Sequence, residues 1–349
     1  KERRVFVVDD TLYERNRSKK VECLSKVFDH DEMKYKKGFR LLTLSWTDGF
    51  SFVPVAFRLI SSARCMLCQG KSYDKRTLSA KRRSESLFPM PEAALRMLEK
   101  VKHFGIEYVL YDAWFGTPKM MLETLKLGYD AICRMKRTSK VFYRYRGKQM
   151  ISERLIPLIN KEKWQEDPRI IGSIIVAIGE RQQKIKLVFC KEEEQFAGND
   201  FQIIASTDTM LSSIEIVQMY GKRWDIETFF KMCKSYLRLT KEYEGLNYDA
   251  MTAFVTIVFF RYSMVSLEIR NQADPKTFGV LFFAVCDEVR DVSVLESLSR
   301  IFFEAVLEVT PAYQPNSEVV SFANSLMDAF IRLIPKHLHL NFGKPCYSI

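Results

Sequence analysis

The strongest constraint on the fold is a pair of short apolar runs that each lead into acidic residues. Residues 5–8 lead into Asp9, Asp10 and Thr11, and residues 108–111 lead into Asp112. Short runs of β-branched and aromatic residues are typical of strands. Loops at the strand ends of an α/β sheet expose side chains while the sheet holds them rigidly, so catalytic groups collect there. The two runs predict a sheet that presents carboxylates at one edge.

The order of the neighbouring elements predicts a mixed α/β sheet. Residues 39–46 and 50–59 have strand character and are joined at Asp48-Gly49, a dipeptide typical of a hairpin. Helical spacing follows over residues 91–104 and again over 118–127, on either side of the strand at 108–111. Three strands, a helix, a strand and a helix form such a sheet when the crossovers are right-handed.

The rest of the chain divides into a β-rich part and a helical part. Short strands are expected at residues 141–145, 170–179, 185–190 and 201–206, and Ser212 with Glu215 forms a capping box at the start of a helix. We therefore expect a catalytic core that begins with residues 1–138, a β-rich insertion at 139–208 and a core helix bearing Glu227 at 209–245. A helical C-terminal region at 246–349 would follow.

One helical stripe between residues 220 and 234 carries unusual chemistry. Tyr220, Arg223, Glu227 and Lys234 have offsets of 0, 3, 7 and 14, which places them within roughly 60° of one another on an α-helix. A single carboxylate among cations suits a metal ligand whose neighbours bind phosphate. The alternative is an exposed helix face with ordinary i,i+3 and i,i+4 ion pairs.

The residues beside the stripe predict how the helix packs. Asp225 is expected on the far side of the helix. A core role is expected for the apolar residues of this stretch, which are Trp224, Ile226, Phe229, Phe230 and Leu237.

The formal net charge of +11 over 349 residues favours a polyanionic partner, either nucleic acid or an anionic membrane surface. The most apolar stretch, residues 250–269, is interrupted by Arg261 and Glu268, so a buried helix is preferred to a membrane span. This removes most of the case for a membrane partner.

The eight cysteines are too sparse for a disulfide scaffold, and no secretory signal opens the chain, so a reducing cytosol is expected. Cys65 and Cys68 have the only metal-like spacing, and a fortuitous loop pair is preferred to a zinc site. His337 and His339 receive no role.

Asp9, Asp112 and Glu227 would supply three hard oxygen donors of the kind that Mg²⁺ prefers. Two such ions, with Mn²⁺ as a substitute, can activate a water or a 3′-hydroxyl and stabilise the leaving oxygen of a phosphodiester. Arg223 and Lys234 would bind phosphate oxygens. Because no Ser or Cys nucleophile with a His base is evident, and no Gly-rich phosphate loop, the prediction is metal-assisted phosphoryl transfer on nucleic acid.

The spacing of Tyr220, Arg223, Glu227 and Lys234 resembles the YREK signature of the IS-four type of DDE transposases from bacterial insertion sequences. The Asp-Asp-Thr of residues 9–11 resembles the first Asp-x-Thr element of that family, and residues 111–116 (YDAWFG) resemble its second Asp element. The resemblance covers roughly residues 5–239. Asp9 fits the Asp-x-Thr spacing, and adjacent strand residues face opposite ways, so Asp9 is favoured over Asp10 as the first metal ligand.

The resemblance implies an RNase H-like fold and cut-and-paste transposition. Asp9, Asp112 and Glu227 would hold the metals, while Tyr220, Arg223 and Lys234 contact DNA phosphates and an unassigned aromatic residue stacks on a flipped base. Implied partners are double-stranded DNA, at transposon ends and target, and a second copy in a synaptic dimer, in the bacterial cytoplasm with the nucleoid and without a membrane.

Members of this family commonly form a hairpin at the DNA end and carry an N-terminal end-recognition domain. The charged start KERR leads straight into a strand without an initiator Met, so we expect a further N-terminal portion. Two other functions stay open: an RNase H-like nuclease without strand transfer, and a domesticated DNA-binding protein with inactive chemistry.

Overall fold

The computed structural model describes residues 3–29, 32–62, 74–159, 167–191, 201–239 and 245–272, which all belong to one unit, Lys1–Phe278. The strands are β1 (Val5–Glu14), β2 (Ser25–Asp29), β3 (Lys34–Thr47), β4 (Phe52–Ile60), β5 (Tyr108–Tyr111), β6 (Asp130–Met135), β7 (Tyr143–Tyr145), β8 (Lys148–Met150), β9 (Ile170–Ile178), β10 (Gln183–Lys191) and β11 (Phe201–Ser206). The helices are α1 (Leu78–Glu85), α2 (Met90–Lys100), η2 (Lys102–Phe104), α3 (Pro118–Lys126), α4 (Ser152–Leu155), η3 (Ile156–Leu158), α5 (Ser213–Gly221), α6 (Trp224–Ser235) and α7 (Tyr248–Gln272).

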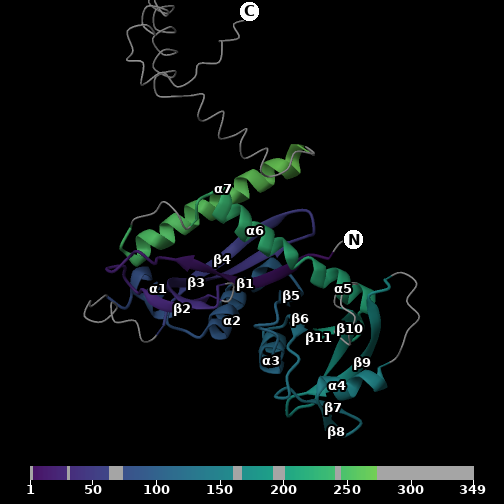
Figure 1. Ribbon diagram of the computed structural model, residues 1–349. Helices are drawn as coiled ribbons and strands as arrows, with labels where there is room; N and C mark the ends of the chain where they lie inside the picture. The colour runs from purple at the N-terminus through teal and green to yellow at the C-terminus, as the bar shows by residue number, and fades with distance from the viewer. Residues whose placement is uncertain are drawn as a thin grey trace, which may run out of the picture. The chain divides into compact units, whose positions relative to one another are not determined.

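Five strands at the centre have the RNase H-like arrangement. Their order is β4-β3-β1-β5-β6, in which β3 is antiparallel to both β4 and β1, while β1, β5 and β6 run parallel. The predicted mixed α/β fold is therefore confirmed, with helices on both faces of the sheet (Figure 1). The Asp48-Gly49 hairpin is confirmed as well: the Asp48 carboxylate accepts hydrogen bonds from the backbone N–H groups of Phe50 and Ser51, and Gly49 has a φ of 98°.

The sequence did not predict β6, and this strand completes the arrangement. Asp130 and Arg134 interrupt its apolar character, although Ala131, Cys133 and Met135 alternate with them and are buried. Beyond β6 the sheet continues through β11, β10, β9, β7 and β8 without a break in the strand order. The β-rich part of the chain therefore extends the central sheet.

The two faces of the sheet are packed by different helices. Phe6 and Val8 of β1 belong to a buried hydrophobic core that includes Met97 of α2 and Met121 of α3. Because successive strand residues face opposite ways, Asp9 lies on the other face, where α6 packs on β1. Figure 1 shows α2 and α3 on one side of the sheet and α6 and α7 on the other.

The helix that was predicted to continue through residues 220–234 is interrupted. α5 ends at Gly221 and α6 begins at Trp224, so a single continuous stripe was wrong. The backbone N–H groups of Lys222 and Arg223 donate to carbonyls three residues earlier, at 3.1 and 3.0 Å, which tightens the chain into a 3₁₀-like turn. The Lys222 ammonium donates to the carbonyls of Arg3 and Asp48 and fixes this turn against the edge of the sheet.

The capping box at the start of α5 is confirmed. The Ser212 hydroxyl accepts from the backbone N–H of Glu215, and the Glu215 carboxylate accepts from the backbone N–H of Ser212. This reciprocal pair fixes the residue at which α5 begins.

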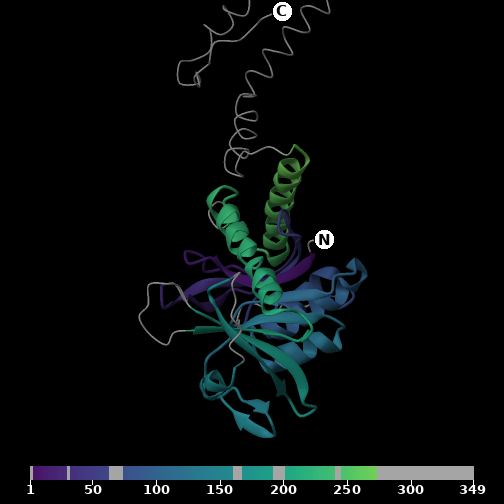
Figure 2. The same ribbon diagram turned by 90° about the vertical axis from the view of Figure 1, so that its right-hand side faces the viewer.

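Helix α7 packs one side against α6 and β4. The ring of Phe229 lies 4.9 Å from that of Phe259 and 4.7 Å from that of Tyr262, and Figure 2 shows the two helices side by side. Ile257 and Phe260, on the other side, are exposed. Within the described ranges, Tyr248–Arg270 is long and apolar enough to cross a membrane by length and composition alone, and it packs here on the sheet as a partly buried helix. The helical prediction beyond residue 272 lies outside the described residues.

Candidate active site

Asp9 lies within β1, because this strand continues to Glu14 and does not end at Val8 as predicted. The neighbouring β5 is shorter. Its last residue, Tyr111, pairs with Val8, so Asp9 is the first residue of β1 beyond the end of β5. Asp112 follows Tyr111 directly. The register therefore brings Asp9 and Asp112 together, and each carboxylate lies within range of the other's charge.

Asp9 and Asp10 point to opposite faces of the sheet. Asp10 forms an ion pair with Arg40 of β3, whereas an Asp9 carboxylate oxygen lies 3.3 Å from the Arg223 guanidinium. The two aspartates therefore have different surroundings, and only Asp9 faces α6. Asp9 stays our candidate for the first ligand.

The Arg223 guanidinium bridges Asp9 and Glu227. One of its terminal nitrogens lies 3.3 Å from the Asp9 carboxylate and the other lies 2.6 Å from Oε1 of Glu227. Its Nε is buried without a hydrogen-bond partner in the structure. One cation thus joins two acids that are more than two hundred residues apart in the chain.

The remaining two signature residues lie around this bridge. The Arg223 guanidinium carbon is 5.6 Å from the centre of the Tyr220 ring, and burial raises the pKa of Tyr220 to about 12, so its hydroxyl is protonated at neutral pH. Lys234 donates to the Thr11 hydroxyl at 2.6 Å. Despite the break between α5 and α6, the four side chains gather near the β1 residues that follow Val8.

Burial raises the pKa of Asp9 from 3.8 to about 7, and the negative charges of Asp112 and Asp10 add to this effect. The backbone N–H of Asp10 and the Arg223 guanidinium oppose it. A carboxylate in this position is short of positive charge, so it favours either a proton or a second cation.

The oxygen donors fit a divalent cation. Asp9, Asp112 and Glu227 offer hard carboxylate oxygens, and the electrostatic surroundings of Asp9 favour added positive charge. Over the described part of the chain, no three His, Cys, Asp or Glu side chains are already gathered into a metal-binding group. The charge of Asp112 acts on Asp9, and Arg223 contacts both Asp9 and Glu227.

The loop after β5 is shaped by its own carboxylate and by a glycine. Asp112 Oδ1 accepts hydrogen bonds from the backbone N–H groups of Trp114 and Phe115, at 3.0 and 3.1 Å. A Cβ atom at Gly116 would lie 1.9 Å from the carbonyl oxygen of Arg134 in β6. Only glycine fits at this position. The Gly of the YDAWFG motif is the sequence signal for this constraint. The sequence alone does not show the reason, which is the close approach of β6.

Trp224 was assigned to the core, and this was wrong. Its side chain is 65% exposed, whereas Ile226, Phe229 and Phe230 are buried. Trp224 is the first residue of α6 after the 3₁₀-like turn, and this turn changes the angular position that a continuous helix would give it. The next residue, Asp225, faces the sheet: its carboxylate accepts a hydrogen bond from the Thr47 hydroxyl at 2.9 Å, which helps to fix α6 on β3.

The other predicted candidates give no second site. Cys65, Cys68, His337 and His339 lie outside the described residues. Cys23, Cys133, Cys190 and Cys233 are buried free thiols, and burial raises the pKa of Cys133 and Cys190 to about 12.

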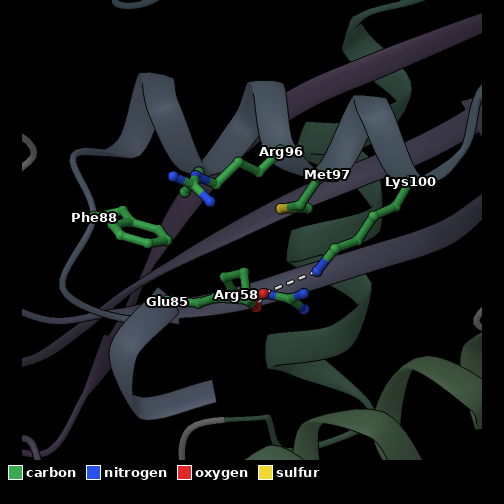
Figure 3. A pocket seen from close by; sticks show the side chains of 7 residues that line it. Arg58, Glu85, Phe88, Arg96, Met97 and Lys100 are labelled. Atoms are coloured by element: carbon green, nitrogen blue, oxygen red, sulfur yellow. Dashed lines mark hydrogen bonds and ion pairs between the residues drawn. The ribbon is translucent and has the colours of Figure 1, made fainter. Parts of the chain in front are cut away.

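A small pocket lies on the opposite face of the sheet from Asp9. Glu85 accepts from Lys100 at 2.9 Å there and forms an ion pair with Arg58 at 2.6 Å (Figure 3). Arg58 pairs in register with Leu42, whose side chain belongs to the core beneath α2. The lining residues are Arg58, Glu85, Phe88, Ala93, Arg96, Met97 and Lys100.

The family model of the DDE superfamily endonucleases matches residues 1–153, which include β1, β5 and both aspartates. The match supports a DDE-type transposase family and a metal-dependent enzyme that cleaves nucleic acid. It ends before α5 and α6, so Tyr220, Arg223, Glu227 and Lys234 lie outside the matched segment. No curated protein matches the chain.

Proposed function

We propose that the protein is a DDE transposase of the YREK group, which cuts DNA at transposon ends and joins the freed 3′-hydroxyl to target DNA. The observation that supports this most directly is the contact of Arg223 with both Asp9 and Glu227, beside Asp112. It links the strand pair of the matched segment to the helix that bears the signature.

Asp9, Asp112 and Glu227 would hold divalent cations, two Mg²⁺ ions or Mn²⁺ in their place. Bound there, such ions lower the pKa of an attacking hydroxyl and stabilise the leaving oxygen of a phosphodiester. Arg223 and Lys234 would bind DNA phosphates, since a guanidinium grips phosphate with two parallel hydrogen bonds and an ammonium acts as a point charge. Tyr220 would act as a hydrogen-bond donor to phosphate.

The proposal includes the division of the chain into a core (1–138 and 209–245), an insertion (139–208) and a helical C-terminal region (246–349). The acting form would be a dimer on double-stranded DNA in the cytoplasm of a bacterium, associated with the nucleoid. No membrane partner is proposed.

The test is a strand-transfer assay. Purified protein is mixed with Mg²⁺, a supercoiled plasmid and duplexes that end in the sequences flanking the gene in its genome. We expect cleavage at the end and covalent joining of the 3′-strand to the plasmid. Cleavage without joining of a pre-cleaved end would select the nuclease, and DNA binding without cleavage in Mg²⁺ or Mn²⁺ would select an inactive DNA-binding protein.

A further inference from the structure

The described residues between β6 and the end of β10 carry an excess of positive charge. Residues 136–159 and 167–191 contain twelve Lys and Arg against three Asp and Glu. Two of these cations are paired within the same part of the sheet: Arg169 with Asp167 at 2.8 Å and Arg137 with Glu153 at 3.8 Å. Residues 131–152 contain seven cations and no acid.

The β7–β8 hairpin presents part of this charge at the edge of the sheet. Tyr143 is buried, and Tyr145 and Met150 pack against the hydrophobic core, so the hairpin is anchored along one side. Arg144 alternates with the two tyrosines and pairs across the hairpin with exposed Gln149. Figure 1 shows β7 and β8 at the end of the sheet that is farthest from β2 and β3.

The apex of the hairpin keeps a cation where the backbone favours other residues. Arg146 and Gly147 form the two-residue turn with φ values of 47° and 80°, both in the left-handed region. Asn-Gly is the usual dipeptide in such a turn, because an Arg side chain is strained there. The exposed Arg146 guanidinium lies 5.3 Å from the centre of the Tyr145 ring, and exposed Lys148 follows the turn. A strained residue at an exposed tip points to a function for its side chain.

We propose that the β7–β8 hairpin is a second DNA contact, in which Arg144, Arg146 and Lys148 bind the sugar-phosphate backbone of duplex DNA outside the cleavage site. A two-stranded β-ribbon fits the major groove, where cations on its flank and tip reach phosphates of both strands. The inference rests on the proposed function, because it takes DNA as the substrate.

The test is equilibrium binding of an uncleavable duplex in EDTA over a range of salt concentrations. Arg146→Asn removes the charge and introduces the residue that the turn favours. The expected result is a melting temperature equal to or above that of the wild type, together with a slope of log affinity against log salt that is smaller by about 1. A purely structural role for Arg146 would change the melting temperature and leave the slope unchanged.

A triple variant, Arg144→Gln with Arg146→Asn and Lys148→Gln, should reduce the slope by about 2 to 3 and weaken duplex binding, while cleavage at saturating DNA stays at the wild-type rate. The matched control removes three cations outside the hairpin, one each from α2, η2 and α3 (Lys100→Ala, Lys102→Ala and Lys126→Ala), and should change the slope much less.

Two results would overturn the inference and leave the proposed function standing: an unchanged slope in a triple variant that still cleaves, or a loss confined to single-stranded DNA. A wild-type protein that binds and cleaves no DNA would overturn the proposed function as well.

Discussion

At the scale of single residues, the buried Asp9 carboxyl group should make stability depend on pH. Its pKa is raised from 3.8 to about 7 by burial and by the charges of Asp112 and Asp10. Between these values the folded protein binds a proton that the unfolded chain has lost, so stability falls as pH rises through this window. Without divalent cations, the free energy of unfolding of Asp9→Asn should rise relative to that of the wild type between about pH 4 and about pH 7, by on the order of 2–4 kcal/mol. Above about pH 7 the difference should stay constant.

Urea unfolding in EDTA at a series of pH values measures this gain. Asp10→Asn is the control, because Asp10 is paired with Arg40 on the opposite face and its replacement should lower stability instead. Added Mn²⁺ should stabilise the wild type above about pH 7 and have little effect on Asp9→Asn. An advantage of Asp9→Asn that is the same at every pH would contradict the role given to burial.

Glu227→Gln should abolish cleavage and leave DNA binding largely intact. The change removes the charge of a proposed metal ligand but no phosphate contact, and the side chain is 40% exposed, so folding should be little affected. Cleavage and duplex binding are measured on the same preparation, with Glu92→Gln on the surface of α2 as a control that should keep both. Loss of binding in step with cleavage would show that Glu227 is structural.

Arg223→Ala should reduce the slope of log DNA affinity against log salt by about 1, and Lys234→Ala should do the same. The two variants should differ in their affinity for metal. Arg223 contacts both Asp9 and Glu227, so its removal should tighten Mn²⁺ binding by the DNA-free protein, whereas Lys234 contacts Thr11 and its removal should not.

Mn²⁺ titration followed by electron paramagnetic resonance, beside DNA binding across salt, separates the two roles of these cations. Unchanged slopes together with lowered melting temperatures would mean that Arg223 and Lys234 only hold α6 to β1.

At the scale of elements, the loop between β5 and α3 should tolerate no side chain at Gly116. A Cβ atom there would meet the Arg134 carbonyl at 1.9 Å, so Gly116→Ala must shift the loop that carries Asp112 or move β6. We expect a loss of about 2 kcal/mol or more in stability and loss of cleavage. Gly221→Ala is the control: nothing lies within 4 Å of its Cβ position, and its effect should be neutral or slightly stabilising. Denaturant unfolding and the cleavage assay measure both variants.

The sequence predicted most of the elements that hold the candidate residues, but it placed some of them imperfectly. The runs at β1 and β5 were visible because apolar residues are concentrated there, and the capping box fixed the start of α5. The extension of β1 past Asp9 was missed, because polar residues 9–11 resemble a strand end when the pairing with β3 is unknown. Trp224 was misplaced because the 3₁₀-like turn before α6 depends on the tertiary contacts of Lys222.

At the scale of the whole described unit, β6 and its neighbours should unfold with the core as one cooperative body. Cys133 on β6 and Cys190 on β10 are buried thiols joined through β11 in one ladder. Thiol labelling in increasing urea, read by mass spectrometry of each peptide, should give both cysteines the same dependence on denaturant. Labelling of Cys190 at a lower urea concentration than Cys133 would show that β10 and its neighbours open separately from the core.

The sequence could not predict that these strands join one sheet. Strand pairing between β6 and β11 connects residues about seventy positions apart, and local spacing carries no signal for such a partner. The contact of Arg223 with Asp9 is of the same kind, since it forms only after α6 has packed on the sheet.

Because the sheet is continuous, the protein would hold its two proposed DNA contacts at a fixed separation. Asp9 on β1, Asp112 directly after β5 and the basic β7–β8 hairpin are attached to one hydrogen-bonded sheet, so none of them can shift without distorting the strands between them. A duplex that contacts both would be gripped at a fixed interval. Each base pair inserted within that interval would rotate the distal phosphates by about 34°, and half a helical turn would carry them to the far side of the helix, away from the hairpin.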